Sequence, residues 1–228
     1  MEIPTLESLL ANYAAQTASA PQEGPPAPSP TTPDELARIV ADLAVALPAD
    51  YQALALRYDL AFVEFNFSRF YPPVARSMRL FDALATVLSS SEYPFSEEYR
   101  RWGVVPVGED TWQNELALAV RQPTEPRTGQ PRQPTHPLAP TRPYGTVWAY
   151  YPDEMHPSMR YAFAFVGSSF TQVLHMALFC WHVSGYRRQS QAARVREEDV
   201  RDALAAIDQA TRAAPYWRLW IAAAVEET

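Results

Sequence analysis

The sequence predicts an α+β fold, in which a mostly antiparallel sheet is flanked by helices and additional helices follow at the C-terminus. Two observations predict this class. Between residues 102 and 170, several short apolar runs show the alternating pattern of strands and are separated by turn-forming residues. The segments on both sides of this stretch instead place apolar residues three or four positions apart, which is the spacing of amphipathic helices.

The N-terminal part is predicted to form an amphipathic helix within residues 1–19, followed by a linker over residues 20–33. Such a short helix is marginally stable alone, so it must dock either on its own core or on a partner. The linker contains six prolines and is predicted to be extended. The apolar face of the helix consists of Leu6, Leu9, Leu10 and Tyr13.

Two short helices and a first strand are predicted next. Thr32 can cap a helix that has proline at its first position and two acids in its first turn. Pro48 ends this helix, and Ala49-Asp50 begins the second. Residues 62–67 alternate as a strand, and residues 75–89 have the period of a further helix.

Four strands are predicted in the central stretch, arranged as two hairpins. The first hairpin turns at residues 108–111, and Pro106 indicates a sheet edge or a strand end. Residues 152–157 connect the second hairpin. Between the hairpins, residues 121–143 contain seven prolines, four arginines and one acid, so they form either a functional loop or an insertion. The predicted strands are residues 104–107, 115–120, 146–151 and 161–166.

The C-terminal part is predicted to be helical. Ser168 or Ser169 caps a long apolar helix that ends at Gly185. Three acids at residues 197–199 mark the start of another helix, and Pro215 starts the last. The uncharged run leading into the long helix changes its period from strand to helix and contains several polar residues, so we predict strand, turn and helix and no membrane span.

Composition narrows the function classes. The formal net charge of −7 argues against a general nucleic-acid binder, and the arginines of the proline-rich loop lack an aromatic platform for RNA. The N-terminus has neither the basic region nor the long apolar run of a secretory signal. Cys180 is the single cysteine, which excludes a disulfide within the chain. We therefore expect a cytoplasmic protein.

No convergent catalytic or metal-binding constellation is visible. His175 and His182 are seven positions apart on the long helix, whereas helical metal ligands are typically four apart. Cys180 and His182 are two positions apart and point to different sides of that helix, so they do not form a nucleophile–base pair. We therefore predict no enzyme activity, no cofactor and no metal.

Acidic residues gather beside aromatic or imidazole side chains in the turns of the two hairpins. Paired carboxylates can act in acid–base chemistry, can simply be solvated, or can steer a basic protein surface while an aromatic side chain supplies contact area. We predict partner binding. The predicted partner-binding residues are Glu109, Asp110, Trp112, Glu115, Asp153, Glu154 and His156.

Four segments over about residues 34–178 resemble, in order, motifs of the SUKH superfamily, which includes Smi/Knr-type proteins and bacterial toxin-immunity proteins. The first lies in the helical corner, the second and third in strands, and the fourth at a strand-to-helix junction. The sequence departs from the family where a Gly-Asp pair would follow the central turn. The segments are Leu47-Pro48-Ala49-Asp50-Tyr51, Trp102-Gly103-Val104-Val105-Pro106-Val107-Gly108, Gly145-Thr146-Val147-Trp148-Ala149-Tyr150-Tyr151 and Phe165-Val166-Gly167-Ser168-Ser169-Phe170.

The resemblance implies a SUKH-like domain over residues 34–186, with residues 187–228 as a C-terminal helical extension. It also implies a non-enzymatic module whose partner is a protein, namely an immunity-type protein that binds and neutralises a cognate bacterial toxin. Two alternatives remain at this point. One is a scaffolding adaptor that docks through its N-terminal and C-terminal helices, and the other is an enzyme of unrecognised type.

Overall fold

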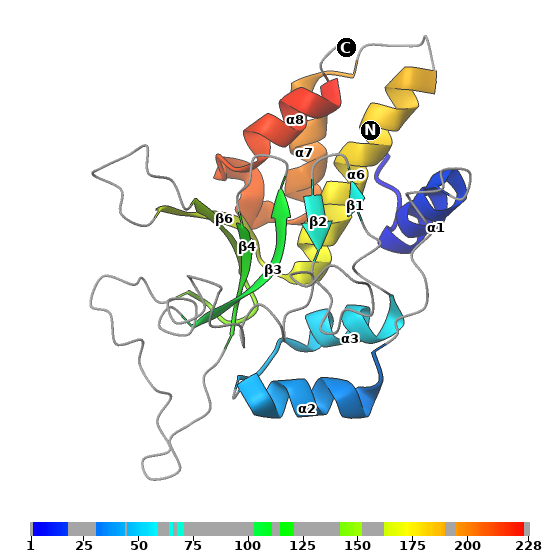
Figure 1. Ribbon diagram of the computed structural model, residues 1–228. Helices are drawn as coiled ribbons and strands as arrows, with labels where there is room; N and C mark the ends of the chain where they lie inside the picture. Colours follow the sequence, from blue (N-terminus) through cyan, green and yellow to red (C-terminus); the bar gives the residue numbers. More distant parts are fainter. Residues whose placement is uncertain are drawn as a thin grey trace.

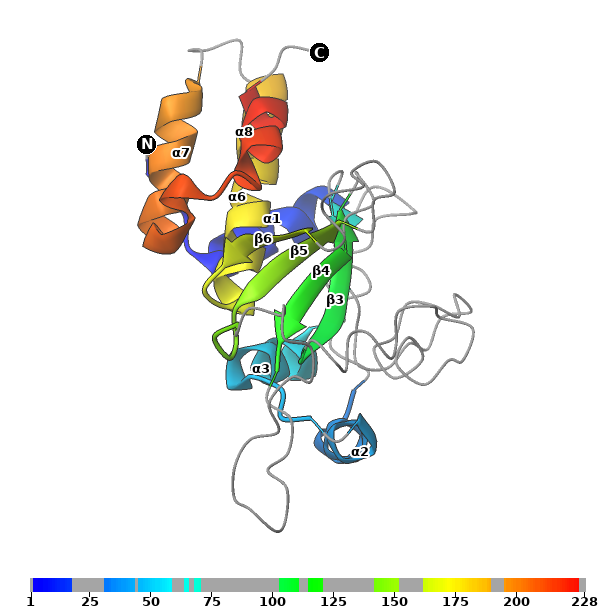
Figure 2. The ribbon, with the colours of Figure 1, turned by 90° about the vertical axis from the view of Figure 1, so that its left-hand side faces the viewer.

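The computed structural model confirms the α+β class (Figure 1). It describes residues 2–17, 31–43, 45–58, 64–65, 68–70, 103–110, 115–120, 142–151, 162–189 and 195–225. The described helices are α1 (Leu6–Thr17), α2 (Pro33–Leu43), α3 (Ala49–Arg57), α6 (Phe170–Gln189), α7 (Glu197–Ile207), the short 3-10 helix η2 (Gln209–Ala213) and α8 (Trp217–Val225). Helices α6, α7 and α8 pack together beside the sheet, and α2 and α3 lie beyond one end of its strands (Figures 1 and 2).

The sheet has six described strands in chain order, and every neighbouring pair is antiparallel. Of the strand predicted over residues 62–67, the structure describes Glu64 and Phe65, which form a strand that pairs with residues 68–70; the other four residues lie outside the described residues. The strands are β1 (Glu64–Phe65), β2 (Ser68–Phe70), β3 (Val104–Asp110), β4 (Glu115–Ala119), β5 (Val147–Tyr151) and β6 (Ala162–Gly167).

Strand β3 is longer than predicted. The turn expected at residues 108–111 begins later, because residues 108–110 pair with β2 on one side. The register between β3 and β4 shifts between Pro106 and Gly108, as at a β-bulge. Pro106 lies next to this irregularity and outside the part of β3 that pairs with β2, where its missing N–H breaks no described ladder bond.

The junction between β6 and α6 has the predicted strand, turn and helix. Of the two candidate caps, Ser169 is the one that accepts a hydrogen bond from a first-turn amide, that of Gln172 (3.2 Å). A Cβ added at Gly167 would lie 2.5 Å from Val173 Cγ2, so strand and helix approach too closely there for any other residue. Among the described helices, none combines the length and hydrophobicity needed to cross a membrane.

The prediction that Gly185 ends the long helix is wrong, because α6 continues to Gln189. A glycine inside a helix costs only about 1 kcal/mol relative to alanine. The preceding part of α6 is anchored by buried residues that include Leu174, Leu178 and Val183. Packing of this kind outweighs the local preference of one glycine.

The C-terminal helices complete the core of the sheet. Trp217 is 2% exposed, and its indole Nε1–H donates to the Val166 carbonyl at the end of β6 (2.8 Å). Tyr216 donates its hydroxyl proton to Asp110 on β3 (3.2 Å). The predicted apolar face of α7 is confirmed, since Val200 and Leu204 are buried in the same cluster.

The N-terminal helix α1 docks on its own core. Its predicted apolar face is confirmed, since Leu9 and Tyr13 are 0% and 1% exposed. The Tyr13 ring packs edge-on against Trp181 of α6, with ring centroids 5.1 Å apart. His175 of α6 also forms a hydrogen bond through Nε2 with the Pro4 carbonyl (2.8 Å). Of the two docking alternatives, the structure therefore contains the one within the chain.

Helix α2 begins as predicted, with a reciprocal capping box. The Glu35 amide donates to Thr32 Oγ1 (3.2 Å), and the Thr32 amide donates to Glu35 Oε2 (2.9 Å). In α3, Asp50 accepts a hydrogen bond from the Thr171 amide (3.1 Å), so the helical corner also caps α6. The helix predicted at residues 75–89 lies outside the described residues.

Candidate binding site

The structure brings two of the predicted site residues together. Glu109 and Glu115 are directly opposed across β3 and β4, and Arg69 of β2 is the opposite neighbour of Glu109. Like charges directly opposite one another in a sheet are unfavourable, so this pair of positions does not serve the stability of the sheet. Four other predicted residues lie outside the described residues: Trp112, Asp153, Glu154 and His156.

Asp110 does not lie where the sequence indicated. The expectation of an exposed turn acid is wrong, because the side chain is only 4% exposed and its Oδ2 accepts the hydrogen bond from Tyr216. The physical reason is the longer β3 strand, which places this carboxylate under the start of α8. Asp110 therefore joins two elements of the core, and a partner cannot reach it.

A group of partly buried aromatic side chains lies on the last two strands. The register pairs Glu115 with Tyr150 and Tyr150 with Phe163, so the row that contains the two opposed glutamates continues to β6. Trp148 and Phe165 are opposed two positions further along these strands, and their rings form a T-shaped contact with centroids 5.4 Å apart. Aromatic pairs of this geometry are favourable beyond the area that they bury.

Arg142 covers these rings. Its guanidinium carbon is 3.6 Å from the centroid of the Phe163 ring and 5.5 Å from that of Trp148. A guanidinium over an aromatic face is attracted by the ring quadrupole, and more strongly where water is excluded. We call Arg142, Trp148, Phe163 and Phe165 the arginine–aromatic platform.

A tight turn positions the arginine. Thr146 donates its hydroxyl proton to the Pro143 carbonyl (2.6 Å), and the hydroxyl oxygen of Thr146 accepts a hydrogen bond from Trp148 Nε1 (2.7 Å). Gly145 has a φ of 87°, which only glycine adopts readily, and its amide donates to the Ala119 carbonyl at the end of β4 (2.9 Å). The turn is thus bonded both to the sheet and to the indole on which Arg142 lies.

The guanidinium of Arg142 is not fully paired. Burial lowers its pKa from 12.5 to about 10, so it remains a cation at neutral pH. Its Nε and Nη1 atoms are buried, and neither has a hydrogen-bond partner among the described residues. An arginine presents its N–H groups in a planar fork that fits a carboxylate, and here part of that fork is unused.

The other reactive groups in the described residues are occupied or inaccessible. Cys180 is fully buried, and burial raises the pKa of its thiol to about 12, so it is protonated at neutral pH. His175 is bonded to the Pro4 carbonyl, and burial lowers the pKa of His182. In the part of the chain that the structure describes, no three metal-ligating side chains gather into a group that could hold a metal ion.

Sequence reasoning missed Arg142 because it was grouped with the other arginines of the proline-rich segment. A signal was present in the residues that follow. A Pro-Tyr-Gly-Thr run leading directly into an aromatic strand indicates a tight turn, and such a turn fixes the residue before it.

Comparisons of the chain with protein-family models, with curated proteins and with solved structures each find no match. The interpretation of the platform therefore rests on its own geometry and on the sequence motifs. The platform combines aromatic contact area with a guanidinium whose Nε and Nη1 have no hydrogen-bond partner among the described residues.

Proposed function

We propose that the chain is a non-enzymatic protein-binding module of SUKH type, and that it is an immunity-type protein that binds and neutralises a toxin. The order of the four sequence motifs supports the family and, with it, the role. The observation that carries protein binding is the Arg142 guanidinium, which lies over Phe163 with two buried nitrogen atoms that lack partners.

The chemistry of the platform suits a protein surface. Arginine, tryptophan and tyrosine are the side chains that most often dominate binding energy at protein interfaces. In this site Trp148 and Phe163 supply apolar area, and Arg142 supplies a cation that is already partly dehydrated. Because Nε and Nη1 are buried, a carboxylate of the toxin would pair with them only after the groups that cover them move.

Binding is favoured over catalysis because the reactive side chains have structural roles. The Cys180 thiol is protonated and buried, and the Asp50 and Asp208 carboxylates accept hydrogen bonds from amides at the N-termini of α6 and η2. The buried free thiol also suits a reducing compartment, and we propose a cytoplasmic location. Neutralisation then requires only that the toxin surface is covered.

The adaptor alternative retains one supporting observation. Leu219 of α8 is 54% exposed, which is unusual for a large apolar side chain in the described residues. Docking of an adaptor through its N-terminal helix is less favoured, because the apolar face of α1 is already buried against α6. A docking subunit would therefore use α8.

The test is protection from the product of the neighbouring gene, expressed together with this chain in a host strain. We expect that gene product to arrest growth alone and this chain to relieve the arrest. Arg142→Glu is expected to abolish protection and to weaken binding about a hundredfold, since it places like charges at a dehydrated contact.

Arg57→Glu is the matched control, because Arg57 also stacks on an aromatic ring (Tyr58, 5.0 Å) but lies on α3. This variant should protect as well as the wild-type chain. A neighbouring product that is harmless alone, or that remains harmful beside the wild-type chain, would contradict the immunity role. Full protection by Arg142→Glu would contradict the platform as the binding site.

A further inference from the structure

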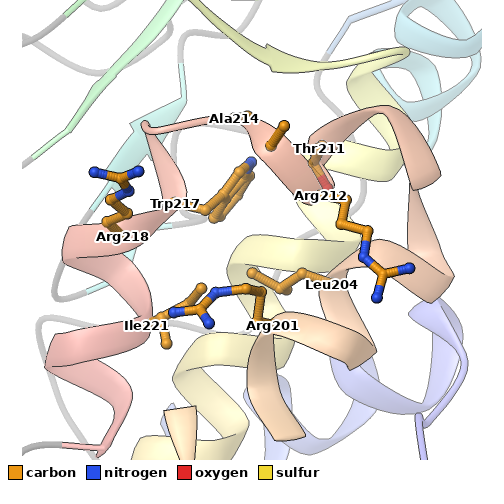
Figure 3. Close-up of a pocket in the computed structure, with 9 residues that line it drawn as sticks. Arg201, Leu204, Thr211, Arg212, Ala214, Trp217, Arg218 and Ile221 are labelled. Carbon is orange, nitrogen blue, oxygen red and sulfur yellow. The ribbon is translucent and has the colours of Figure 1, made fainter. Parts of the chain in front are cut away.

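A second site lies away from the platform, in a pocket of about 390 Å³ between α7, η2 and α8 (Figure 3). Its volume is in the range of sites that hold one or two large side chains. The pocket has an apolar floor and a charged rim. The lining residues are Arg201, Leu204, Thr211, Arg212, Ala213, Ala214, Trp217, Arg218 and Ile221.

The floor is rigid and apolar. Leu204, Trp217 and Ile221 are 2%, 2% and 3% exposed, and they belong to the main core cluster. The hydrogen bond from Trp217 Nε1 to the Val166 carbonyl fixes the indole against the sheet. An apolar side chain that entered the pocket would therefore meet a surface that is already ordered, which reduces the entropy lost on binding.

Every charged side chain that lines the pocket is an arginine, and each comes from a different element. Arg201 of α7 lies 3.6 Å from Glu197, and Arg212 of η2 lies 3.9 Å from Asp202. Both ion pairs are long and exposed, so they are weak and leave N–H groups available. Arg218 of α8 has no ion pair with any described residue.

The three guanidinium groups do not converge on one point. In Figure 3, Arg212 and Arg218 lie on opposite sides of Trp217, while Arg201 reaches across the pocket toward Ile221. A single small carboxylate could contact only one or two of these groups. A ligand that uses all three has several negative charges spaced along its length, with apolar groups between them.

We propose that this pocket binds an acidic segment of the protein partner, in which glutamate or aspartate residues flank a large apolar side chain. The inference rests on the proposed protein-binding function and names a class of partner surface. The whole chain has a formal net charge of −7, whereas every charged side chain that lines this pocket is positive, so the pocket can align such a segment. The acids of the segment replace Glu197 and Asp202 as partners of the arginines.

The first test measures binding of a short fluorescent peptide of alternating glutamate and leucine by fluorescence anisotropy. Arg212→Gln/Arg218→Gln should weaken binding about tenfold, because each exposed charge contact contributes a modest share. Arg196→Gln is the matched control, since Arg196 is an exposed arginine on the same side of the fold that pairs with Asp199 and does not line the pocket. It should bind the peptide as the wild-type chain does.

A variant with the opposite effect is also available. Asp202→Asn removes the internal competitor of Arg212 and should strengthen peptide binding about twofold. The same peptide with glutamine in place of glutamate should not bind. If no acidic peptide binds, if binding ignores the pocket arginines, or if citrate and phosphate alone bind with the same dependence, the proposal is overturned.

The two proposals fail in different ways. Arg212→Gln/Arg218→Gln should lose protection in the growth assay and retain the wild-type midpoint of urea unfolding. If wild-type protection is observed and this variant protects equally, the pocket inference fails and the immunity role stands. If the wild-type chain gives no protection, the immunity role fails, and the peptide measurement still decides whether the pocket binds an acidic segment.

Discussion

The polar groups on the two sides of this sheet differ in how completely they are hydrogen-bonded. On the side of α6 and α8, Asp208 and Trp217 have their hydrogen-bond partners inside the chain. At the platform, Arg142 is only partly buried as a residue, yet its Nε and Nη1 are buried and have no hydrogen-bond partner among the described residues. The first arrangement stabilises the fold. The second leaves N–H groups without the hydrogen bonds that buried donors normally make, and the proposed function assigns them to a partner.

The contrast is sharpest between Asp208 and Arg142. Asp208 is 4% exposed, and its carboxylate accepts from the Ser168 amide (2.6 Å), the Ser168 hydroxyl (3.0 Å) and the Ala210 amide (3.1 Å). One side chain thus connects the β6–α6 junction to the start of η2. Removing it leaves buried donors unpaired, whereas removing Arg142 leaves none.

The largest effect is expected for Asp208→Ala. We expect a loss of about 3 kcal/mol in the free energy of unfolding, because three hydrogen bonds to a charged group are lost and two backbone donors lose their acceptor. Urea unfolding followed by circular dichroism measures this change. Asp202→Ala is the control, since this exposed acid on α7 should change the value by less than about 0.5 kcal/mol. If Asp208→Ala and Asp202→Ala lowered the free energy of unfolding equally, the hydrogen bonds of Asp208 would not contribute to stability as expected.

A smaller effect is expected for Tyr216→Phe. The substitution keeps the ring, which packs against Trp217, and removes only the hydroxyl that donates to Asp110. The free energy of unfolding should fall by about 1 kcal/mol, since the bond reaches a buried carboxylate. Tyr58→Phe is the control, since the Tyr58 hydroxyl makes no hydrogen bond with a described residue, and it should leave stability unchanged. The same urea experiment compares the two variants.

Arg142→Met is expected to leave the free energy of unfolding within about 0.5 kcal/mol of the wild type, or to raise it. Methionine keeps an apolar stem against Phe163 and removes a partly dehydrated charge for which no ion pair with a described residue is present. Binding of the protein partner should weaken in the same variant. A clear loss of stability would show that Arg142 stabilises the fold, as Asp208 does, and would contradict the proposed difference between these two residues.

The smallest change in the free energy of unfolding at neutral pH is expected for substitution of Cys180, whose thiol reports whether solvent reaches the buried face of α6. Burial raises the pKa of this thiol from 9.0 to about 12. The native state therefore keeps a proton that the unfolded state loses, so this contribution to stability is complete below pH 9 and is lost as the pH rises toward 12. Burial raises the pKa of Tyr51 as well, and that contribution has the same sign.

Cys180→Ala removes the thiol contribution, so its loss of stability between pH 9 and pH 12 should be smaller than that of the wild type. Urea unfolding at several pH values measures the difference. The native wild-type thiol should also resist alkylation at pH 8 until the protein unfolds. Rapid alkylation of the folded protein would contradict this expectation, since it would show that solvent reaches the Cys180 thiol in the native state.

Local chemistry in the sequence was sufficient to predict the fold class and most element starts. The caps at Thr32 and Ser169 depend on residues within one turn, so their side chains identify them directly. The end of α6 could not be predicted from Gly185, because the helix is held by contacts with distant elements. Periodicity also predicted which faces of α1 and α7 are buried.

The candidate site was less predictable for the same reason. Asp110 looked like a turn acid, and its actual role depends on Tyr216, which is 106 positions away. The platform depends on a turn that is recognisable, but the partner rings of Arg142 come from two strands. The three pocket arginines have no common spacing, since α7, η2 and α8 bring them together only after packing.

The order of the strands has a consequence for how the protein is made. Every strand pairs only with its neighbours in the chain, so each can pair soon after it leaves the ribosome. The closing contacts are much less local: Pro4 must wait for His175, 171 positions later, and Asp110 must wait for Tyr216. The strands therefore precede the helices α6, α7 and α8 that pack beside them, and the contacts of Trp217 and Tyr216 with the sheet are among the last that can form during synthesis.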